Sequence, residues 1–144
     1  MKRFVRCVCF FLAVTMILVT PAFAAEIATP RASNYFAYHS TYLEKTSGTQ
    51  FDVWFDVTAV GGMDELGTST IEVQRSSDNV NWTTMKTYTK SSYSQMICED
   101  TCAHADYVTY YGTSGYYYRA YVVFYAKKGS GTAEYSMYTS SIKL

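Results

Sequence analysis

The sequence predicts an all-β fold, a single antiparallel β-sandwich of about seven strands that follows an N-terminal signal peptide. Three observations predict this fold class. Apolar and polar residues alternate along several segments, and no segment sustains the period of a helix. Beyond Ala24 the chain is rich in tyrosine, threonine, valine and serine, which favour strands and turns. Clusters of glycine, serine and asparagine separate the alternating segments, as turns do.

The N-terminal segment 1–24 has the pattern of a secretory signal peptide. Basic residues precede an apolar stretch at 8–19, and the small residues Ala22 and Ala24 occupy the positions that a signal peptidase requires. This stretch is well short of the ~20 residues that span a membrane. We therefore expect cleavage after Ala24 and a secreted chain with no membrane anchor, in which a flexible segment at 25–33 leads into one domain at 34–144.

The first predicted hairpin joins strands at 35–43 and 50–60, and the glycine pair at 61–62 ends the second of them. Residues 63–67 make a compact connection. Five further strands are expected at 70–75, 82–89, 106–111, 116–127 and 132–143. Residues 90–105 are polar and are predicted to be irregular. The predicted core residues include Phe51, Val53, Phe55, Val57, Ile71, Val73, Tyr116, Tyr118, Ala120, Val122 and Phe124.

Two local patterns support strand pairing. The segment 115–120, with the turn at 128–131, resembles the last two strands of a fibronectin type III or similar immunoglobulin-like sandwich. In those folds a tyrosine opens the penultimate strand and bonds its hydroxyl to nearby backbone, and Tyr116 occupies that position. Residues 71–84 are similar to a hairpin of discoidin-like carbohydrate-binding modules, with Asn79 in place of a glycine.

Three motifs run across most of the domain: 63–67, 76–78 with Trp82, and 118–120 leading to 124–129. On these motifs the chain resembles a family of small secreted proteins from Gram-positive bacteria that has no assigned function. The resemblance implies a secreted β domain and brings no activity with it. The cysteine pair described next is not part of the family's pattern.

Cys98 and Cys102 are the cysteines that lie beyond Ala24. A disulfide is expected in an exported protein. It requires a turn, because residues four apart in a strand lie ~13 Å apart and a bridge needs Cα atoms within ~7 Å. Two free thiols are an alternative to the disulfide. A metal site formed by both cysteines, His104 and either Asp100 or Asp106 is another. That spacing matches no usual zinc pattern, so we expect no metal and no cofactor.

The outward face of the penultimate strand is the best candidate for a binding surface. It carries Tyr117, Arg119, Tyr121 and Tyr125, a series of rings with a cation between them that suits sugar stacking or a protein contact. Cross-strand aromatic pairing that only stabilises the sheet is the alternative. Trp54, which points outward from an earlier strand, is added as a second candidate.

No catalytic constellation is predicted. Asp52 and Asp56 flank Trp54, but their backbones lie ~13 Å apart in a strand, beyond the ~5–9.5 Å of glycosidase pairs. His39 and His104 have no neighbouring nucleophile in the sequence. We therefore expect no enzyme, but a non-enzymatic binding module at or near the cell surface, with a glycan or a protein as partner. A secreted effector or bacteriocin-like protein is the alternative.

Charge argues against a nucleic-acid partner. The chain has 12 basic and 12 acidic residues, and the segment 1–24 holds three of the basic and none of the acidic ones, which leaves 9 against 12, a net charge of −3. A nucleic-acid surface needs a basic patch instead. The remaining length suits one domain, which we expect to be monomeric.

Overall fold

The computed structural model describes residues 34–144, and within them the chain is all-β. Seven strands form one curled antiparallel sheet. The predicted signal peptide at 1–24, its cleavage after Ala24 and the lead-in at 25–33 lie outside the described residues. No helix in the described part is both long and apolar enough to cross a membrane. The predicted all-β class is therefore confirmed.

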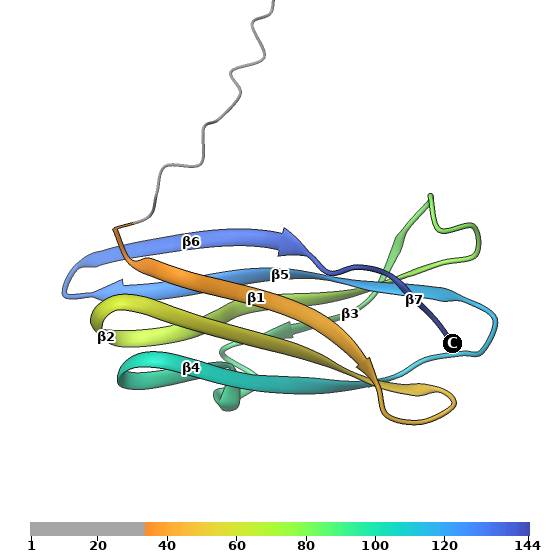
Figure 1. Ribbon diagram of the computed structural model, residues 1–144, viewed down its shortest axis with the longest axis horizontal. Helices are drawn as coiled ribbons and strands as arrows, with labels where there is room; N and C mark the ends of the chain where they lie inside the picture. Colours follow the sequence, from red (N-terminus) through yellow and green to blue (C-terminus); the bar gives the residue numbers. More distant parts are fainter. Residues whose placement is uncertain (1–33) are drawn as a thin grey trace, which may run out of the picture.

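Figure 1 shows the order of the strands along the chain. Their bounds are β1 (Phe36–Lys45), β2 (Gln50–Ser76), β3 (Thr83–Thr89), β4 (Ile97–Tyr111), β5 (Tyr117–Lys128), β6 (Gly131–Tyr138) and β7 (Ile142–Lys143). A short 3₁₀ helix, η1 (Ser94–Met96), precedes β4.

The long strand β2 organises the sheet because it pairs along both of its edges. Residues 50–58 of β2 lie between β1 and β4, and we call this part of the sheet the first arm. Residues 65–76 lie beside β5 on one edge, and on the other edge residues 65–67 pair with the start of β4 and residues 70–75 with β3. β6 and β7 add to β5, and we call this part the second arm. In Figure 1, β2 crosses the molecule, turns at one end and returns, so the two arms lie over one another.

The turn in β2 differs from the sequence prediction. The pairing of β2 with β4 shifts register between Thr58 and Met63, where Gly61 and Gly62 lie, but pairing resumes at once with Met63 opposite Thr101. The predicted end of the strand at the two glycines is therefore wrong, as is the irregular structure predicted over 97–105. The reason is that β4 bends together with β2, with a positive φ of 50° at Asp100, so the ladder continues through the bend.

The last predicted strand is also divided. β6 ends at Tyr138, and β7 begins at Ile142. Between them, the Thr139 N–H donates to the Ala120 carbonyl (2.9 Å) and the Thr139 hydroxyl accepts from the Ala120 N–H (2.9 Å). The number of strands agrees with the prediction only because one predicted pair merges into β2 while another strand splits.

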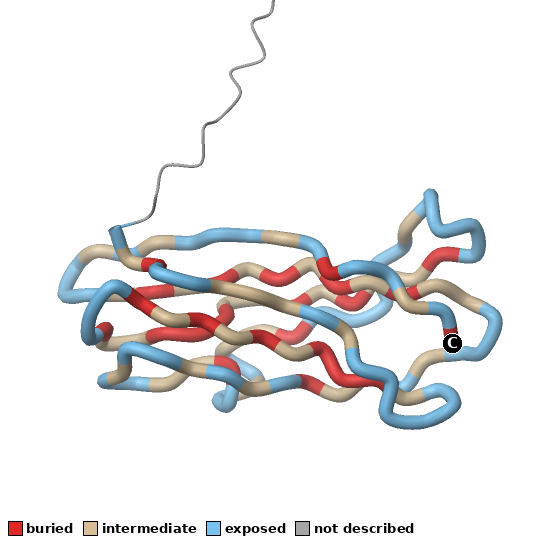
Figure 2. Tube along the Cα trace, in the orientation of Figure 1, coloured by how far each residue is buried: buried red, intermediate tan, exposed pale blue. Residues whose placement is uncertain are grey.

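The core lies between the two arms. Figure 2 shows buried residues alternating with exposed ones along the strands, which is the predicted period of two. Rings from the two arms meet directly, with Phe51 and Tyr118 centroids 5.3 Å apart. Of the predicted inward residues, Tyr116 is only partly buried. The others are buried: Phe51, Val53, Phe55, Val57, Ile71, Val73, Tyr118, Ala120, Val122 and Phe124.

One tyrosine hydroxyl near the start of β5 is bonded to backbone, as in the folds that the sequence resembles. The residue is Tyr118, whose hydroxyl accepts a hydrogen bond from the Thr113 N–H at 2.7 Å. The sequence pattern placed this role at Tyr116, which instead lies under the Arg75 guanidinium at 4.5 Å. Tyr118 faces the core and Tyr116 precedes the strand, so only Tyr118 is buried where a hydroxyl needs a partner.

Candidate binding surfaces

Three aromatic residues form a row across the outer face of the first arm. Trp54 of β2 is the direct partner of Tyr42 on β1 and of Tyr107 on β4, so all three side chains point to the same side of the sheet. The Tyr42 and Trp54 rings are nearly parallel, at 9° with centroids 6.2 Å apart, and the Trp54 and Tyr107 centroids are 4.6 Å apart. We call Tyr42, Trp54 and Tyr107 the aromatic row.

The aromatic row is open to solvent at both of its ends. Tyr42 is 51% exposed and Tyr107 is 41% exposed, while Trp54 between them is partly buried. Tyr38 and Tyr111, two further exposed rings, face the same side. The buried indole N–H of Trp54, at the centre of the row, has no hydrogen-bond partner among the described residues. An unsatisfied buried donor of this kind lowers the free energy of unfolding by about 1–3 kcal/mol.

Carboxylates flank the aromatic row. Asp52 and Asp56 share the outward side of β2 with Trp54, one on each side of it, and Glu44 lies opposite Asp52 on β1. Asp52 is buried and accepts a hydrogen bond from the Thr109 hydroxyl at 2.6 Å. The two aspartates stay four residues apart along one strand. The structure therefore does not converge them into a catalytic pair.

The predicted binding residues of β5 lie on the outer face of the second arm. We call Tyr117, Tyr121 and Tyr125, with Arg119 among them, the tyrosine stripe. The Arg119 guanidinium lies between two rings, 4.3 Å from the centroid of Trp82 and 4.2 Å from that of Tyr138. Its Nε donates to the Gln74 side-chain oxygen at 2.9 Å, which fixes the guanidinium in place.

The other rings of the tyrosine stripe are covered in the same way. The Lys90 ammonium lies 3.5 Å from the centroid of Tyr125, and that of Lys143 lies 5.0 Å from the centroid of Tyr117. Tyr121 packs on Tyr138, with centroids 4.9 Å apart. The stripe's rings therefore contact side chains of their own chain, which is the structural alternative that the sequence left open.

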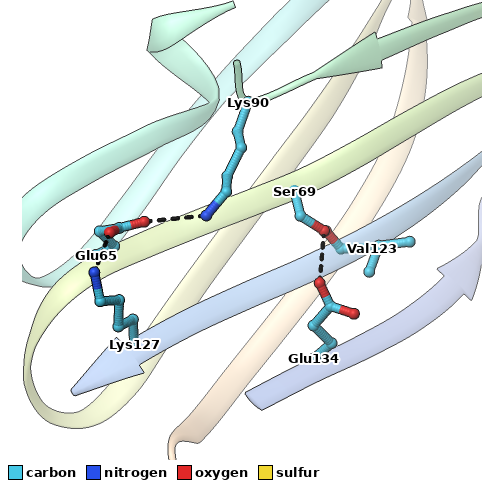
Figure 3. Close-up of polar contacts among 6 residues, drawn as sticks. All are labelled: Glu65, Ser69, Lys90, Val123, Lys127 and Glu134. Carbon is cyan, nitrogen blue, oxygen red and sulfur yellow. Dashed lines mark hydrogen bonds and ion pairs between the residues drawn. The ribbon is translucent and has the colours of Figure 1, made fainter. Parts of the chain in front are cut away.

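A carboxylate holds the lysine above Tyr125. Figure 3 shows Glu65 accepting hydrogen bonds from Lys90 at 3.1 Å and from Lys127 at 2.8 Å. The bond from Lys127, then the bond from Lys90, lowers the pKa of the Glu65 carboxyl. A second contact in Figure 3, from the Ser69 hydroxyl to Glu134 at 3.1 Å, ties β2 to the edge strand β6.

Both cysteines lie on β4 as free thiols, so the predicted disulfide is not seen. Cys98 pairs with Leu66 of β2, and the segment runs as strand with a single left-handed residue, Asp100, rather than as the turn that a bridge requires. The His104 ring contacts the Gln95 carbonyl oxygen at 2.8 Å. Within 34–144, no group of three or more His, Cys, Asp or Glu side chains could hold a metal ion.

An open pocket of about 460 Å³ adjoins the aromatic row at Tyr107, between β3, η1 and β4. Lys86 and Asp106 place one charge of each sign on its wall. The Tyr88 hydroxyl in this wall donates to the Thr109 carbonyl at 2.7 Å, and burial raises its pKa to about 12. None of the described residues that line it is a serine, cysteine or histidine, so the wall offers polar contacts rather than a nucleophile with its base.

The structure thus brings together residues that the sequence did not connect. Of the aromatic row, only Trp54 was a sequence-based candidate; Tyr42 and Tyr107 were missed. The register of two separate strand pairs decides that they meet, and period-two alternation gives only the side to which each ring points.

Comparison of the chain with protein-family models, with curated proteins and with solved structures finds no match.

Proposed function

We propose that this chain is a secreted, non-enzymatic binding module that holds a cell-surface glycan on the aromatic row. The observation that carries the proposal is the exposed alignment of Tyr42, Trp54 and Tyr107 on three neighbouring strands. A sugar ring has an apolar face of C–H groups that packs on an aromatic face, while its hydroxyls reach polar groups beside the ring. Asp56 supplies such an acceptor, whereas Asp52 is buried and already accepts a hydrogen bond from Thr109.

The rigidity of the first arm favours this proposal. Trp54 stands on the central strand, where β1 and β4 both pair with β2, so the rings need little ordering when a ligand binds. Tyrosine and tryptophan also present a large contact area at low entropy cost, which makes them frequent anchors of binding surfaces. We extend the proposal to the fold: the two arms are the layers of an immunoglobulin-like sandwich, the arrangement that the sequence resembles.

The tyrosine stripe is the less suitable surface. A ligand that stacks on Tyr125 must first displace Lys90, and one that stacks beside Arg119 must separate it from Trp82 or Tyr138. Each displacement costs a cation–π contact of about 0.5–2 kcal/mol before any new contact forms. Stacking on the aromatic row displaces no cation, because no lysine or arginine of the described residues lies over its rings.

The test is a glycan array with the purified protein, followed by titration of the tightest-bound glycan into three variants. Tyr42→Ala and Tyr107→Ala should each weaken binding by about tenfold, since a stacked ring is worth on the order of 1–2 kcal/mol. Tyr121→Ala, which removes the same residue type from the tyrosine stripe, is the matched control and should bind like the wild type.

Two results would contradict the proposal. One is an array on which no glycan is retained by the folded protein. The other is the reverse pattern, in which Tyr121→Ala loses affinity at unchanged thermal stability while both variants of the aromatic row bind normally. The second result would move the binding site to the tyrosine stripe.

A further inference from the structure

The rings of the aromatic row have no lysine or arginine of the described residues over them, as is also true of the exposed rings of Tyr38, Tyr111 and Tyr135. Elsewhere in the described chain, lysine and arginine side chains lie over the rings of Tyr88, Tyr116, Tyr117, Tyr125, Tyr138 and Trp82. None of the cations in 34–144 covers Tyr42, Trp54 or Tyr107. No lysine or arginine of the described residues therefore competes with an outside cation for the faces of these three rings.

The charges nearest Trp54 are negative, whereas Lys86 of β3 places a positive charge in the pocket that Tyr107 lines at one end of the row. Asp52 and Asp56 lie two residues from Trp54 in each direction, roughly 7 Å along the strand, and Glu44 lies beside Asp52 on the neighbouring strand. None of the three carboxylates has an ion-pair partner among the described residues. The other outward residues of the first arm are also free of lysine and arginine: Tyr38, Ser40, Gln50, Thr58, Ala103, Ala105, Thr109 and Tyr111.

Open ring faces and unpaired carboxylates together favour a cation. A positive group over Trp54 gains from the ring quadrupole and from the carboxylates on both sides of it, whereas a neutral ligand gains only from stacking. An anionic ligand over Trp54 would meet repulsion from three carboxylates, and Lys86 offers a positive charge only at the Tyr107 end of the row. Charge complementarity at Trp54 therefore favours positively charged glycans over phosphate- or sulfate-bearing ones.

The position of the row favours a sugar over a peptide as the carrier of that charge. An extended peptide binds a sheet by pairing with an unpaired edge, but the backbone of β2 at Trp54 is paired on both sides. A ligand over Trp54 therefore meets side chains only, although β1 and β4, which carry Tyr42 and Tyr107, pair with β2 alone. The row presents rings at centroid spacings of 6.2 and 4.6 Å, with the Tyr107 plane tilted by 41° to that of Trp54, so successive sugar rings of a linear oligosaccharide would each meet an aromatic ring at its own angle.

We infer that the aromatic row binds an oligosaccharide of amino sugars with free ammonium groups, such as β-1,4-linked glucosamine. The sugar rings stack on Tyr42, Trp54 and Tyr107, and the ammonium groups lie against Asp56 and Glu44, with Asp52 adding to the field. This inference rests on the proposed function, since it names the ligand class of the same surface.

The test compares three β-1,4-linked hexaoses of matched backbone: glucosamine, N-acetylglucosamine and glucose. Titration calorimetry is done at mildly acidic pH, where the sugar amines carry their proton. The glucosamine hexaose should bind about tenfold more tightly than either neutral hexaose, and added salt should reduce that preference. Asp56→Asn with Glu44→Gln should remove the preference, so that the variant binds the glucosamine hexaose no more tightly than either neutral hexaose.

Glu72→Gln is the matched control, because Glu72 is a carboxylate on the outer face of the second arm. It should keep the preference for glucosamine. Equal, salt-independent binding of all three hexaoses would overturn the inference and leave the proposed function standing. Binding of neither the glucosamine hexaose nor any other cationic sugar would overturn it as well, and the glycan array then decides the proposed function separately. A lysine-rich peptide that binds the aromatic row where glucosamine hexaose does not would assign the face to a protein partner instead.

Discussion

The outer faces of both arms carry aromatic and charged residues, but only on the second arm do cations of the described chain lie over the rings. On the second arm, each ring of the tyrosine stripe is paired, and Arg119 between Trp82 and Tyr138 is the centre of that pairing. On the first arm, the aromatic row has rings that contact one another but no cation, and carboxylates that have no ion-pair partner in the described chain. Aromatic content therefore does not identify a binding face. The difference lies in whether the chain supplies the partner that a ring requires.

Because the rings of the tyrosine stripe contact cations and rings of their own chain, substitutions on the two outer faces should change the free energy of unfolding by different amounts. A ring or cation removed from the tyrosine stripe leaves a partner unsatisfied within the fold, so it lowers stability. A ring removed from the ends of the aromatic row leaves little unsatisfied, because these side chains are largely exposed. Four measurements of the free energy of unfolding test this comparison.

The largest effect is expected from Arg119→Ala. It removes contacts to two rings and the hydrogen bond to Gln74, and should lower the free energy of unfolding by about 2 kcal/mol and the Tm by about 8 °C. Thermal and urea denaturation measure both quantities. The free energy of unfolding and the Tm of Arg119→Lys should lie between those of the wild type and Arg119→Ala, since an ammonium keeps the charge but not the planar contact. A wild-type Tm in Arg119→Ala would show that the stripe is not self-paired in solution.

A smaller effect is expected from Tyr88→Phe, which concerns the contact between the arms. The Tyr88 hydroxyl on β3 donates to the Thr109 carbonyl on β4, and its loss should cost about 1 kcal/mol. Burial raises the pKa of this phenol from 10.0 to about 12, so its stabilising contribution is complete below pH 10 and is lost as pH rises through the folded-state value. Urea titrations at neutral and high pH check this, and Tyr88→Phe should abolish that part of the alkaline loss.

Glu65→Gln should have a still smaller effect, under about 1 kcal/mol, because its two ion pairs are partly exposed. Hydrogen bonds from Lys127 and Lys90 lower the pKa of Glu65 below its usual 4.5. The ionised carboxylate therefore stabilises the fold above pH 4.5, and this contribution disappears as pH falls through the lowered value. The wild type and variant should differ at neutral pH and converge in acid. A constant difference at all pH values would rule out this linkage.

The smallest effect on stability is expected from Tyr42→Ala, within about 0.5 kcal/mol of the wild type. Tyr42 is half exposed, and it contacts Trp54 at a centroid distance of 6.2 Å without a hydrogen bond to fix it. Urea denaturation measures the difference. A loss comparable to that of Arg119→Ala would mean that the aromatic row is a structural element, and the contrast between the faces would then fail.

Much of the fold could be predicted from the sequence because alternation is a local property. The residues predicted to face the core along 51–57 and 116–124 do so, apart from Tyr116, which is only partly buried. The bend of β2 and the extent of β4 could not be predicted in this way. A glycine pair reads as the end of a strand, and whether the ladder continues past it depends on whether a distant strand bends with it.

The sequence by itself determined the all-β class, the two-residue period and the side of the sheet to which each ring points, because these follow from backbone geometry and propensity over a few residues. Tertiary structure alone decided which rings have partners. Trp54 meets Tyr42, 12 positions before it, through one register, and Tyr107, 53 positions after it, through another. Arg119 meets Trp82 only because β3 and β5 flank the same arm of β2. Register and strand order are long-range choices made by the core, so the aromatic row and the self-paired tyrosine stripe became distinguishable only in the folded chain.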